Sequence, residues 1–274
     1  MSFTLQGPLL LAGAGRMGGA ILSTLLARGL DPRLVLVQDP EPPVEIADVL
    51  ADACIDVLPF IDELSSPPEV IILAVKPQVV DAVLPGLARL AGPHTMLLSI
   101  SAGRRLDGLA RHMPEGAAIV RAMPNTPAAI GRGLTVCVAN AHVTPAQRAL
   151  ADELMGAVGE VLWVDDEALL DPVTAVSGSG PAYVFLLTEC LAEAGREAGL
   201  EAGLAERLAR ATVVGSAALL EQSGVSAAQL RRNVTSPGGT TAAALEILGG
   251  SEGLQKLMTA AVAAATKRGR ELAK

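Results

Sequence analysis

The stretch "PLLLAGAGRMGGA", residues 8–20, decides the fold of the first half of this chain. An apolar run ends in glycines spaced as G-x-G-x-x-G, and a helical pattern follows at once. Between a strand and a helix, this spacing is typical of a turn that binds the pyrophosphate of a dinucleotide, although a purely structural turn is the alternative. We expect the cofactor contacts of this turn to be Gly13, Ala14, Gly15, Arg16, Met17 and Gly18.

Short β-rich runs alternate with helical patterns as far as residue 165, which is typical of a parallel sheet with crossover helices. The runs are "PLLLAGAG", "RLVLVQD", "CIDVL", "EVIILAV", "TMLLSIS", "AAIVRAM", "GLTVCVA" and "EVLWVD". The sequence therefore predicts an α/β fold in which residues 1–165 form a Rossmann-type domain with a doubly wound, mostly parallel sheet.

Residues 166–274 lack strand signals and predict an all-helical domain. A helix is expected from Pro181 to about Leu200, a second over residues 204–223, and a last one with Ser251 as its N-cap. The first of these is apolar nearly all round, through "YVFLLTECLAEAG", so a lone subunit could hardly cover it. We expect this domain to bind substrate and to dimerise.

Composition excludes several classes of protein. A net charge of −8 and a pI near 5.0 argue against nucleic acid as a partner, and the longest apolar runs fall short of the roughly 20 residues that span a membrane. Cys54, Cys137 and Cys190 lie far apart in apolar segments and indicate reduced core residues, with no metal site. The start lacks the pattern of a signal peptide, and we expect a cytoplasmic protein.

Polar residues at the ends of later strands indicate how the rest of a dinucleotide is bound. Asp39 and Glu41 follow the second run, and no basic residue comes before Lys76, so local charge favours NADH, unless Asp39 is only a turn residue. Lys76 lies either over the cofactor or in a solvated turn. The amide of Asn125, in "RAMPNTP", suits a nicotinamide carboxamide; the alternative is a common Asx-type turn.

Two further glycine-rich clusters open helices in the second half: "VSGSGPAY", residues 176–183, and "TSPGGTT", residues 235–241. Free N–H groups and hydroxyls at a helix N-terminus form a good receptor for a carboxylate. We expect "TSPGGTT" to bind a small anionic substrate; close helix packing at a dimer interface is the alternative, and the two are compatible.

Taken in order, "GAGRMGGAI", "LAVKPQ", "RAMPNTP", "TAVSGSGPAYVF", "EAGREAGL" and "NVTSPGGTTAAAL" resemble the pyrroline-5-carboxylate reductase family, from about residue 9 to residue 270. The resemblance implies reduction of 1-pyrroline-5-carboxylate to proline, the last step of proline biosynthesis. It also implies a homodimer or larger homo-oligomer whose helical domains interlock, with the active site between protomers.

The resemblance also implies roles for individual residues. Ala74, Lys76 and Pro77 would flank the cofactor, and Asn125 would lie near the nicotinamide. Family members mostly prefer NADPH, against the local charge at Asp39, and "LPFIDELSSPPEV" lacks a cofactor-contacting Asn that many members carry. The residues implied to bind the substrate are Ser236, Gly239, Thr240 and Thr241, with Thr241 also near the ring nitrogen.

The predicted reaction is hydride transfer from NAD(P)H to the C=N carbon of a cyclic imine. A protonated imine is already electrophilic, so positioning suffices, with Thr241 as the catalytic residue that orients the ring nitrogen. One alternative is a hydroxyacid dehydrogenase of similar plan, but its helical-domain lysine is missing between Lys76 and Lys256. Another is a dimeric dinucleotide sensor without catalysis, against which the intact "TSPGGTT" weighs.

Overall fold

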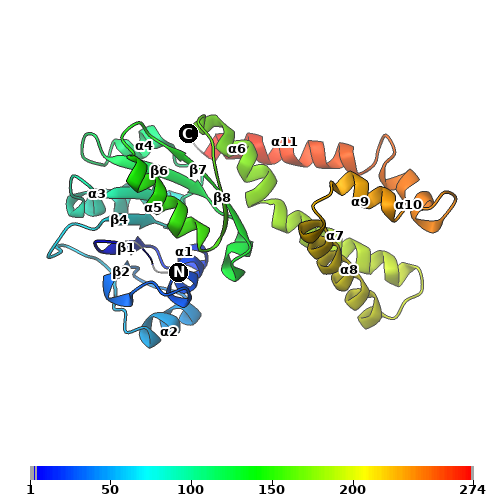
Figure 1. The fold of residues 1–274 in the computed structure, drawn as a ribbon, viewed down its shortest axis with the longest axis horizontal. Helices are drawn as coiled ribbons and strands as arrows, with labels where there is room; N and C mark the ends of the chain where they lie inside the picture. The colour runs from blue at the N-terminus through cyan, green and yellow to red at the C-terminus, as the bar shows by residue number, and fades with distance from the viewer. Residues whose placement is uncertain (1–2, 4, 273–274) are drawn as a thin grey trace. The chain divides into compact units, whose positions relative to one another are not determined.

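The computed structural model describes residue 3 and residues 5–272 of the chain. The chain divides into two compact units, Met1–Gly178 with Ala265–Lys274, and Ser179–Ala264. We call them the sheet unit and the helical unit (Figure 1). None of the helices in the described part of the chain is long and apolar enough to cross a membrane.

The sheet unit is built on eight strands in the order β3-β2-β1-β4-β5-β6-β7-β8. All neighbouring pairs are parallel except β6 and β7, which run antiparallel. Each of the eight runs read from the sequence contains a strand, although β8 begins one residue before its run, so the predicted mostly parallel, doubly wound sheet is confirmed. The strands are β1 (Leu9–Ala12), β2 (Val35–Gln38), β3 (Val57–Leu58), β4 (Val70–Leu73), β5 (Met96–Ser99), β6 (Ala118–Met123), β7 (Gly133–Ala139) and β8 (Gly159–Trp163).

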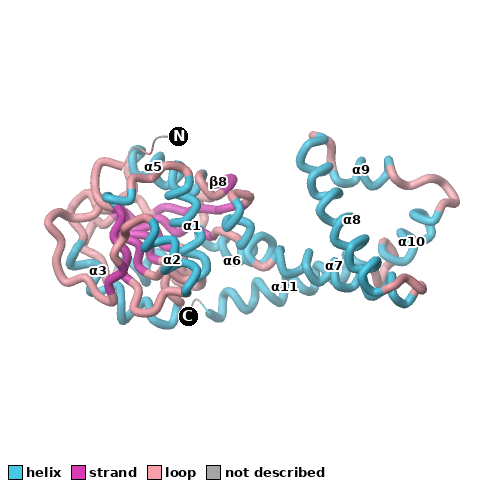
Figure 2. Tube along the Cα trace, turned by 90° about the horizontal axis from the view of Figure 1, so that it is seen from below, coloured by secondary structure: helices cyan, strands magenta, loops and turns pink. Residues whose placement is uncertain are grey.

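Helices cover both faces of this sheet, so β1, β4 and β5 are buried on both sides, and β1 and β4 read as unbroken apolar runs. In Figure 2, α1 and α2 lie together on one side of the strands and α3 on the other. The helices are α1 (Arg16–Ala27), α2 (Val44–Asp52), α3 (Val80–Leu90), α4 (Leu106–Ala110), α5 (Pro145–Gly156) and α6 (Leu170–Val173). Short 3₁₀ helices lie at Pro32–Leu34, Pro77–Val79, Thr126–Ile130 and Glu167–Leu169, and a π-helical turn at Thr174–Gly178.

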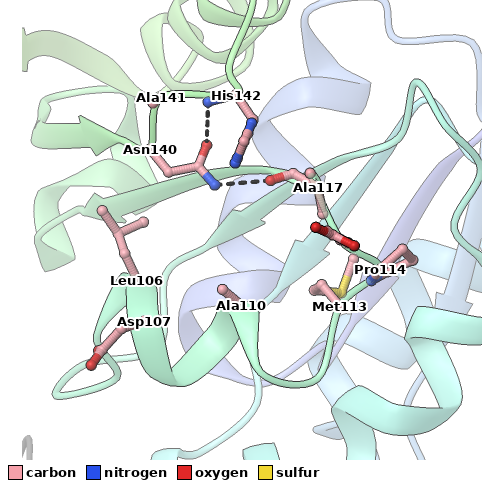
Figure 3. Close-up of a pocket in the computed structure, with 11 residues that line it drawn as sticks. Leu106, Asp107, Ala110, Met113, Pro114, Ala117, Asn140, Ala141 and His142 are labelled. Atoms are coloured by element: carbon pink, nitrogen blue, oxygen red, sulfur yellow. Dashed lines mark hydrogen bonds between the residues drawn. The ribbon is translucent and has the colours of Figure 1, made fainter.

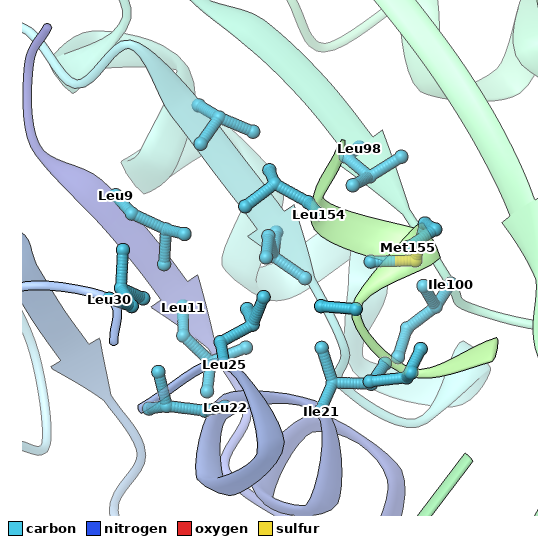
Figure 4. Close-up of a cluster of buried hydrophobic side chains, with 14 of the residues drawn as sticks. Leu9, Leu11, Ile21, Leu22, Leu25, Leu30, Leu98, Ile100, Leu154 and Met155 are labelled. Atoms are coloured by element: carbon cyan, nitrogen blue, oxygen red, sulfur yellow. The ribbon is translucent and has the colours of Figure 1, made fainter. Parts of the chain in front are cut away.

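The two faces carry separate apolar layers. Side chains of β1, α1 and α5, among them Leu11, Ile21 and Leu154, fill one layer (Figure 4). Leu84 and Leu87 of α3 pack against the other face of the sheet. This double burial anchors the strand ends from which the loops of the site extend.

The helical unit has almost no interior of its own. It holds α7 (Gly180–Glu197), α8 (Ala202–Ser223), α9 (Ala227–Asn233), α10 (Thr240–Leu248) and the first part of α11 (Leu254–Leu272). Among its described residues, the buried hydrophobic ones are Ala192, Ala205 and Ala209. Phe185 and Leu186 of α7 are 61% and 58% exposed in the single chain, as expected of a helix that needs a partner to cover it.

Two sequence expectations need correction. Ser251 is not the N-cap of the last helix, because Gly253 N–H donates to the Gly250 carbonyl (2.9 Å) in a tight turn and the helix begins only at Leu254. Of the cysteines expected in the core, only Cys137 is buried; Cys54 and Cys190 are exposed in this chain. Cys54 lies in the turn that follows α2, where its φ is 55°.

Candidate active site

The glycine turn between β1 and α1 is packed too tightly for side chains at two of its positions. Gly13 has a φ of +94°, and a Cβ there would lie 2.8 Å from the Ala74 carbonyl carbon. A Cβ on Gly18 would lie 2.2 Å from the Gly13 carbonyl oxygen. Both positions therefore require glycine, for the tight turn and for the packing of helix on strand that the sequence predicts.

Gly15 differs from these two because the space around it is open. No atom lies within 4 Å of the position that a Cβ would take, and its φ of −68° is ordinary. Gly15 is the N-cap of α1 without any side-chain cap, so the first N–H groups of the helix are free for an anion. This cradle fits the pyrophosphate of a dinucleotide. Of the other predicted contacts, Arg16 is exposed and Met17 is half-buried against the core.

Asp39, directly after β2, braces the glycine turn. Its Oδ2 accepts a hydrogen bond from Ala14 N–H (2.6 Å), and its Oδ1 accepts one from Glu41 N–H (2.8 Å). The carboxylate is therefore fixed at the carboxyl end of β2, the place where a dinucleotide's adenine ribose is recognised. The structure unites the two sequence interpretations of Asp39, since it is a turn residue and also lies beside the predicted site.

The end of β4 supplies the other wall of the turn. Ala74 N–H donates to the Ala12 carbonyl (2.8 Å), which ties the two strand ends together. Lys76 is exposed and precedes the 3₁₀ turn Pro77–Val79. The loop is held because Ser101 Oγ donates to the Val75 carbonyl (3.0 Å). The predicted group Ala74, Lys76 and Pro77 thus lies at the strand edge beside the glycine turn.

Asn125 is more constrained than the sequence indicates. Its Oδ1 accepts a hydrogen bond from Leu134 N–H (2.9 Å), and its Nδ2 donates to Ser177 Oγ (3.1 Å). One lone pair of the amide oxygen and one amide hydrogen are therefore already in use, which leaves one of each for a nicotinamide. Ser177, from the π-helical turn, was not among the predicted site residues; its signal was only the small polar cluster "SGSG".

The predicted substrate loop lies within the helical unit. Gly238 has a φ of +68°, and Gly239 N–H donates to the Ser236 carbonyl (3.0 Å), which closes a turn before α10. Gly239 is the N-cap of α10 and no side chain caps it, so the N–H groups of Thr240 and Thr241 stay free. The loop thus brings together the four predicted residues, and residues 234–245 contain no ionisable side chain.

A pocket of about 530 Å³ lies at the end of the strands opposite the glycine turn, where β6 begins and β7 ends (Figure 3). Leu106, Met113 and His142 are among the residues that line it. Its amide, Asn140, accepts from Ile119 N–H and His142 N–H and donates to the Ala117 carbonyl. These bonds hold the loop together, so Asn140 serves structure, and the glycine turn lies at the other end of the strands.

Comparison with known proteins gives two family matches. Residues 167–272 match the family described as "Pyrroline-5-carboxylate reductase dimerisation", and residues 9–103 match "NADP oxidoreductase coenzyme F420-dependent". The chain is 40% identical to pyrroline-5-carboxylate reductase of Pseudomonas aeruginosa over 261 residues, 95% of each chain. It is 42% identical to that of a Synechocystis strain over 264 residues, 96% of this chain and 97% of the relative.

The chain belongs to the pyrroline-5-carboxylate reductase family. Its structure agrees with solved members over nearly the whole length. The Coxiella burnetii reductase matches with a TM-score of 0.87 and 34% identity, covering 98% of this chain and 99% of that one. The Plasmodium falciparum enzyme, solved with NADP bound, matches with a TM-score of 0.82 and 26% identity, over 98% and 99% of the chains.

Membership of this family confirms the resemblance read from the motifs. The chain is an NAD(P)H-dependent oxidoreductase of proline biosynthesis that acts on a cyclic imine, and its helical C-terminal part is the family's dimerisation domain. The hydroxyacid dehydrogenase and the non-catalytic sensor are therefore not retained.

Proposed function

We propose that this reductase binds the reduced cofactor at residues 13–18 and 1-pyrroline-5-carboxylate at residues 236–241, and releases L-proline. The observation that carries the proposal is the pair of uncapped helix N-termini, at Gly15 and at Gly239, each opened by glycine. Both leave N–H groups free for an anion, a pyrophosphate in one case and a substrate carboxylate in the other.

The chemistry asks little of ionisable side chains. When bound, the reduced nicotinamide supplies the hydride, which adds to the C=N carbon while the ring nitrogen keeps the proton it carries as an iminium. The free N–H groups of α10 hold the carboxylate, helped by the hydroxyls of Ser236 and Thr240. The Thr241 hydroxyl oxygen accepts a hydrogen bond from the ring N–H and fixes the orientation of the ring. Positioning of this kind can lower a barrier by roughly 7 to 11 kcal/mol.

Substitution of Thr241 tests the role of its hydroxyl. In Thr241→Val we expect kcat/KM for the imine to fall about tenfold, the value of one hydrogen bond, while the affinity for cofactor is unchanged. Thr259→Val is the control, because the Thr259 hydroxyl donates within α11 to the Gln255 carbonyl (2.8 Å). Unchanged turnover and substrate affinity in Thr241→Val would refute the role.

We further propose that NADH is preferred to NADPH. A 2′-phosphate on the adenine ribose would come to the carboxyl end of β2, where the Asp39 carboxylate is fixed and Glu41 follows. Like charges brought together in this way cost binding energy, and a preference of at least about tenfold is expected. The opposing observations are the positive charge of Arg16 in the glycine turn and the NADP bound to the Plasmodium falciparum relative. The test therefore measures activity with both cofactors.

The test compares kcat/KM for NADH and NADPH by the loss of absorbance of the reduced cofactor, with proline measured as the product. Asp39→Asn removes the charge and keeps an oxygen for Ala14 N–H, so it should raise the use of NADPH relative to NADH. Asp48→Asn, on the exposed side of α2, removes the same charge elsewhere and should leave the ratio unchanged. Equal or better use of NADPH by the wild type would refute the preference.

We also propose that the two domains divide at residue 165. The protein forms a homodimer or larger assembly, and two subunits share each active site. Its location is cytoplasmic. The exposed apolar side chains of α7 and the match to a dimerisation domain support the assembly. Sedimentation of the purified protein tests it, and a monomer with full activity would contradict the shared site.

A further inference from the structure

We propose that the hydroxyl of Ser177 donates a hydrogen bond to the carbonyl oxygen of the nicotinamide carboxamide, and thereby holds the reactive ring in one orientation. The proposal rests on the cofactor site proposed above. It assigns a role in cofactor binding to a residue of the π-helical turn Thr174–Gly178, outside the glycine turn and the strand-end residues.

The first step is the orientation of the Asn125 amide. The oxygen and nitrogen of an amide are hard to tell apart by shape, but their partners distinguish them. Oδ1 faces the backbone N–H of Leu134 at 2.9 Å, which can only donate. The group that faces Ser177 Oγ at 3.1 Å is therefore the NH₂ group, and it donates to the hydroxyl.

The second step follows from the inventory of a hydroxyl group, which has one hydrogen to donate and two lone pairs that accept. Asn125 occupies a lone pair of Ser177, and among the described residues the hydroxyl has no other hydrogen bond. Thr174, in the same turn, instead donates to the Leu170 carbonyl at 2.7 Å, as hydroxyls in helices commonly do. The Ser177 hydrogen thus remains available to a ligand, and the side chain is half-buried rather than freely solvated.

The third step is the direction in which the cofactor must run. The adenine ribose belongs at the end of β2, beside Asp39, and the pyrophosphate belongs at the glycine turn after β1. The nicotinamide must then extend the other way along the sheet, over the ends of β4, β5 and β6. The π-helical turn packs at the end of β6, since a Cβ on Gly178 would lie 3.1 Å from Met123 Cε. Ser177 is therefore on the nicotinamide side.

The experiment measures dissociation constants by titration calorimetry for three ligands: NADH, its reduced thionicotinamide analogue and ADP-ribose. Sulfur accepts hydrogen bonds weakly, and ADP-ribose has no nicotinamide. The wild type should prefer NADH to the thio analogue about fivefold. In Ser177→Ala this preference should fall to about one, with the affinity for ADP-ribose unchanged. Thr174→Ala, in the same turn, should keep the wild-type preference.

Several outcomes would overturn the proposal. One is a Ser177→Ala protein that still prefers NADH to the thio analogue fivefold; another is a parallel loss of affinity for all three ligands, which indicates a structural role. If ADP-ribose and NADH both fail to bind the wild type, the cofactor site itself is wrong. Ser177→Cys, nearly the same size with a weak donor, is measured as well in case Ser177→Ala does not fold, and an intermediate preference is expected.

Discussion

Gly15→Ala should separate cofactor binding from folding in this reductase. The new methyl group would enter open space, because no atom lies within 4 Å of it and the backbone at Gly15 has an ordinary φ of −68°. Gly and Ala differ by only a few tenths of a kcal/mol to about 1 kcal/mol at a helix N-cap. The free energy of unfolding should therefore change by less than about 1 kcal/mol.

Cofactor binding should respond quite differently. The methyl group would occupy the space through which the pyrophosphate approaches the N–H groups of α1. Overpacking of this kind costs about 1 to 3 kcal/mol, which corresponds to a rise of about 5-fold to 150-fold in the dissociation constant of the reduced cofactor. Gly18→Ala should instead lower the free energy of unfolding, since its Cβ would lie 2.2 Å from the Gly13 carbonyl oxygen and the turn itself would have to move.

The assay pairs thermal unfolding with a fluorescence titration of the reduced cofactor. Gly108→Ala is the matched control, because Gly108 in α4 also has no atom within 4 Å of its missing Cβ and lies away from the glycine turn. It should leave both measurements at the wild-type values or raise the stability slightly. A Gly15→Ala protein that binds cofactor as tightly as the wild type would refute the placement of the pyrophosphate.

Three further outcomes follow from buried and capping groups. Thr135 is fully buried and its hydroxyl has no hydrogen-bond partner among the described residues, so Thr135→Val should stabilise the fold by about 1 kcal/mol, seen as a higher Tm; a lower Tm would contradict this. Burial raises the pKa of the Cys137 thiol to about 12, so iodoacetamide at pH 8 should modify exposed Cys54 and spare Cys137 in the native protein, as peptide mapping would show. The two backbone N–H groups at the start of α8 lower the pKa of Glu201, so its carboxylate stabilises the fold at pH values above the ordinary pKa of 4.5, and this contribution is lost as the pH falls through the lowered pKa. Glu201→Gln should make the free energy of unfolding less dependent on pH in that acid range. An unchanged acid unfolding profile would count against the cap.

Much of the fold can be predicted from local sequence because the central strands β1, β4 and β5 are buried on both faces. β4, within the run "EVIILAV", has no solvent-facing position to interrupt its apolar pattern, and each of the eight runs contains a strand. The short helix α4 was not expected, since it has only five residues and follows a loop. The prediction that Ser251 is the N-cap of the last helix was wrong because the bond from Gly253 N–H to the Gly250 carbonyl closes a tight turn at this position.

The site could be predicted where the backbone determines it and not where distant side chains meet. The glycine turn and "TSPGGTT" carry their geometry in consecutive residues, since glycine and a helix start are local features. The bond between Asn125 and Ser177 joins positions 52 apart in the chain, through a π-helical turn that has no pattern of its own. A sequence could suggest the amide of Asn125 but not that its oxygen already accepts a hydrogen bond from Leu134 N–H.

Because the helical unit has almost no interior of its own, its stability depends on association with another subunit. The buried hydrophobic residues of α7 and α8 are all alanines, and a Cβ on Gly195 would lie 3.3 Å from both Ala205 Cβ and Leu200 Cδ1. Exposed apolar side chains such as Phe185 and Leu186 can be buried against another copy of the chain in this dimerisation domain, so the stability of these helices depends on protein concentration. Dilution should therefore expose this part of the molecule to proteases well before the sheet is affected.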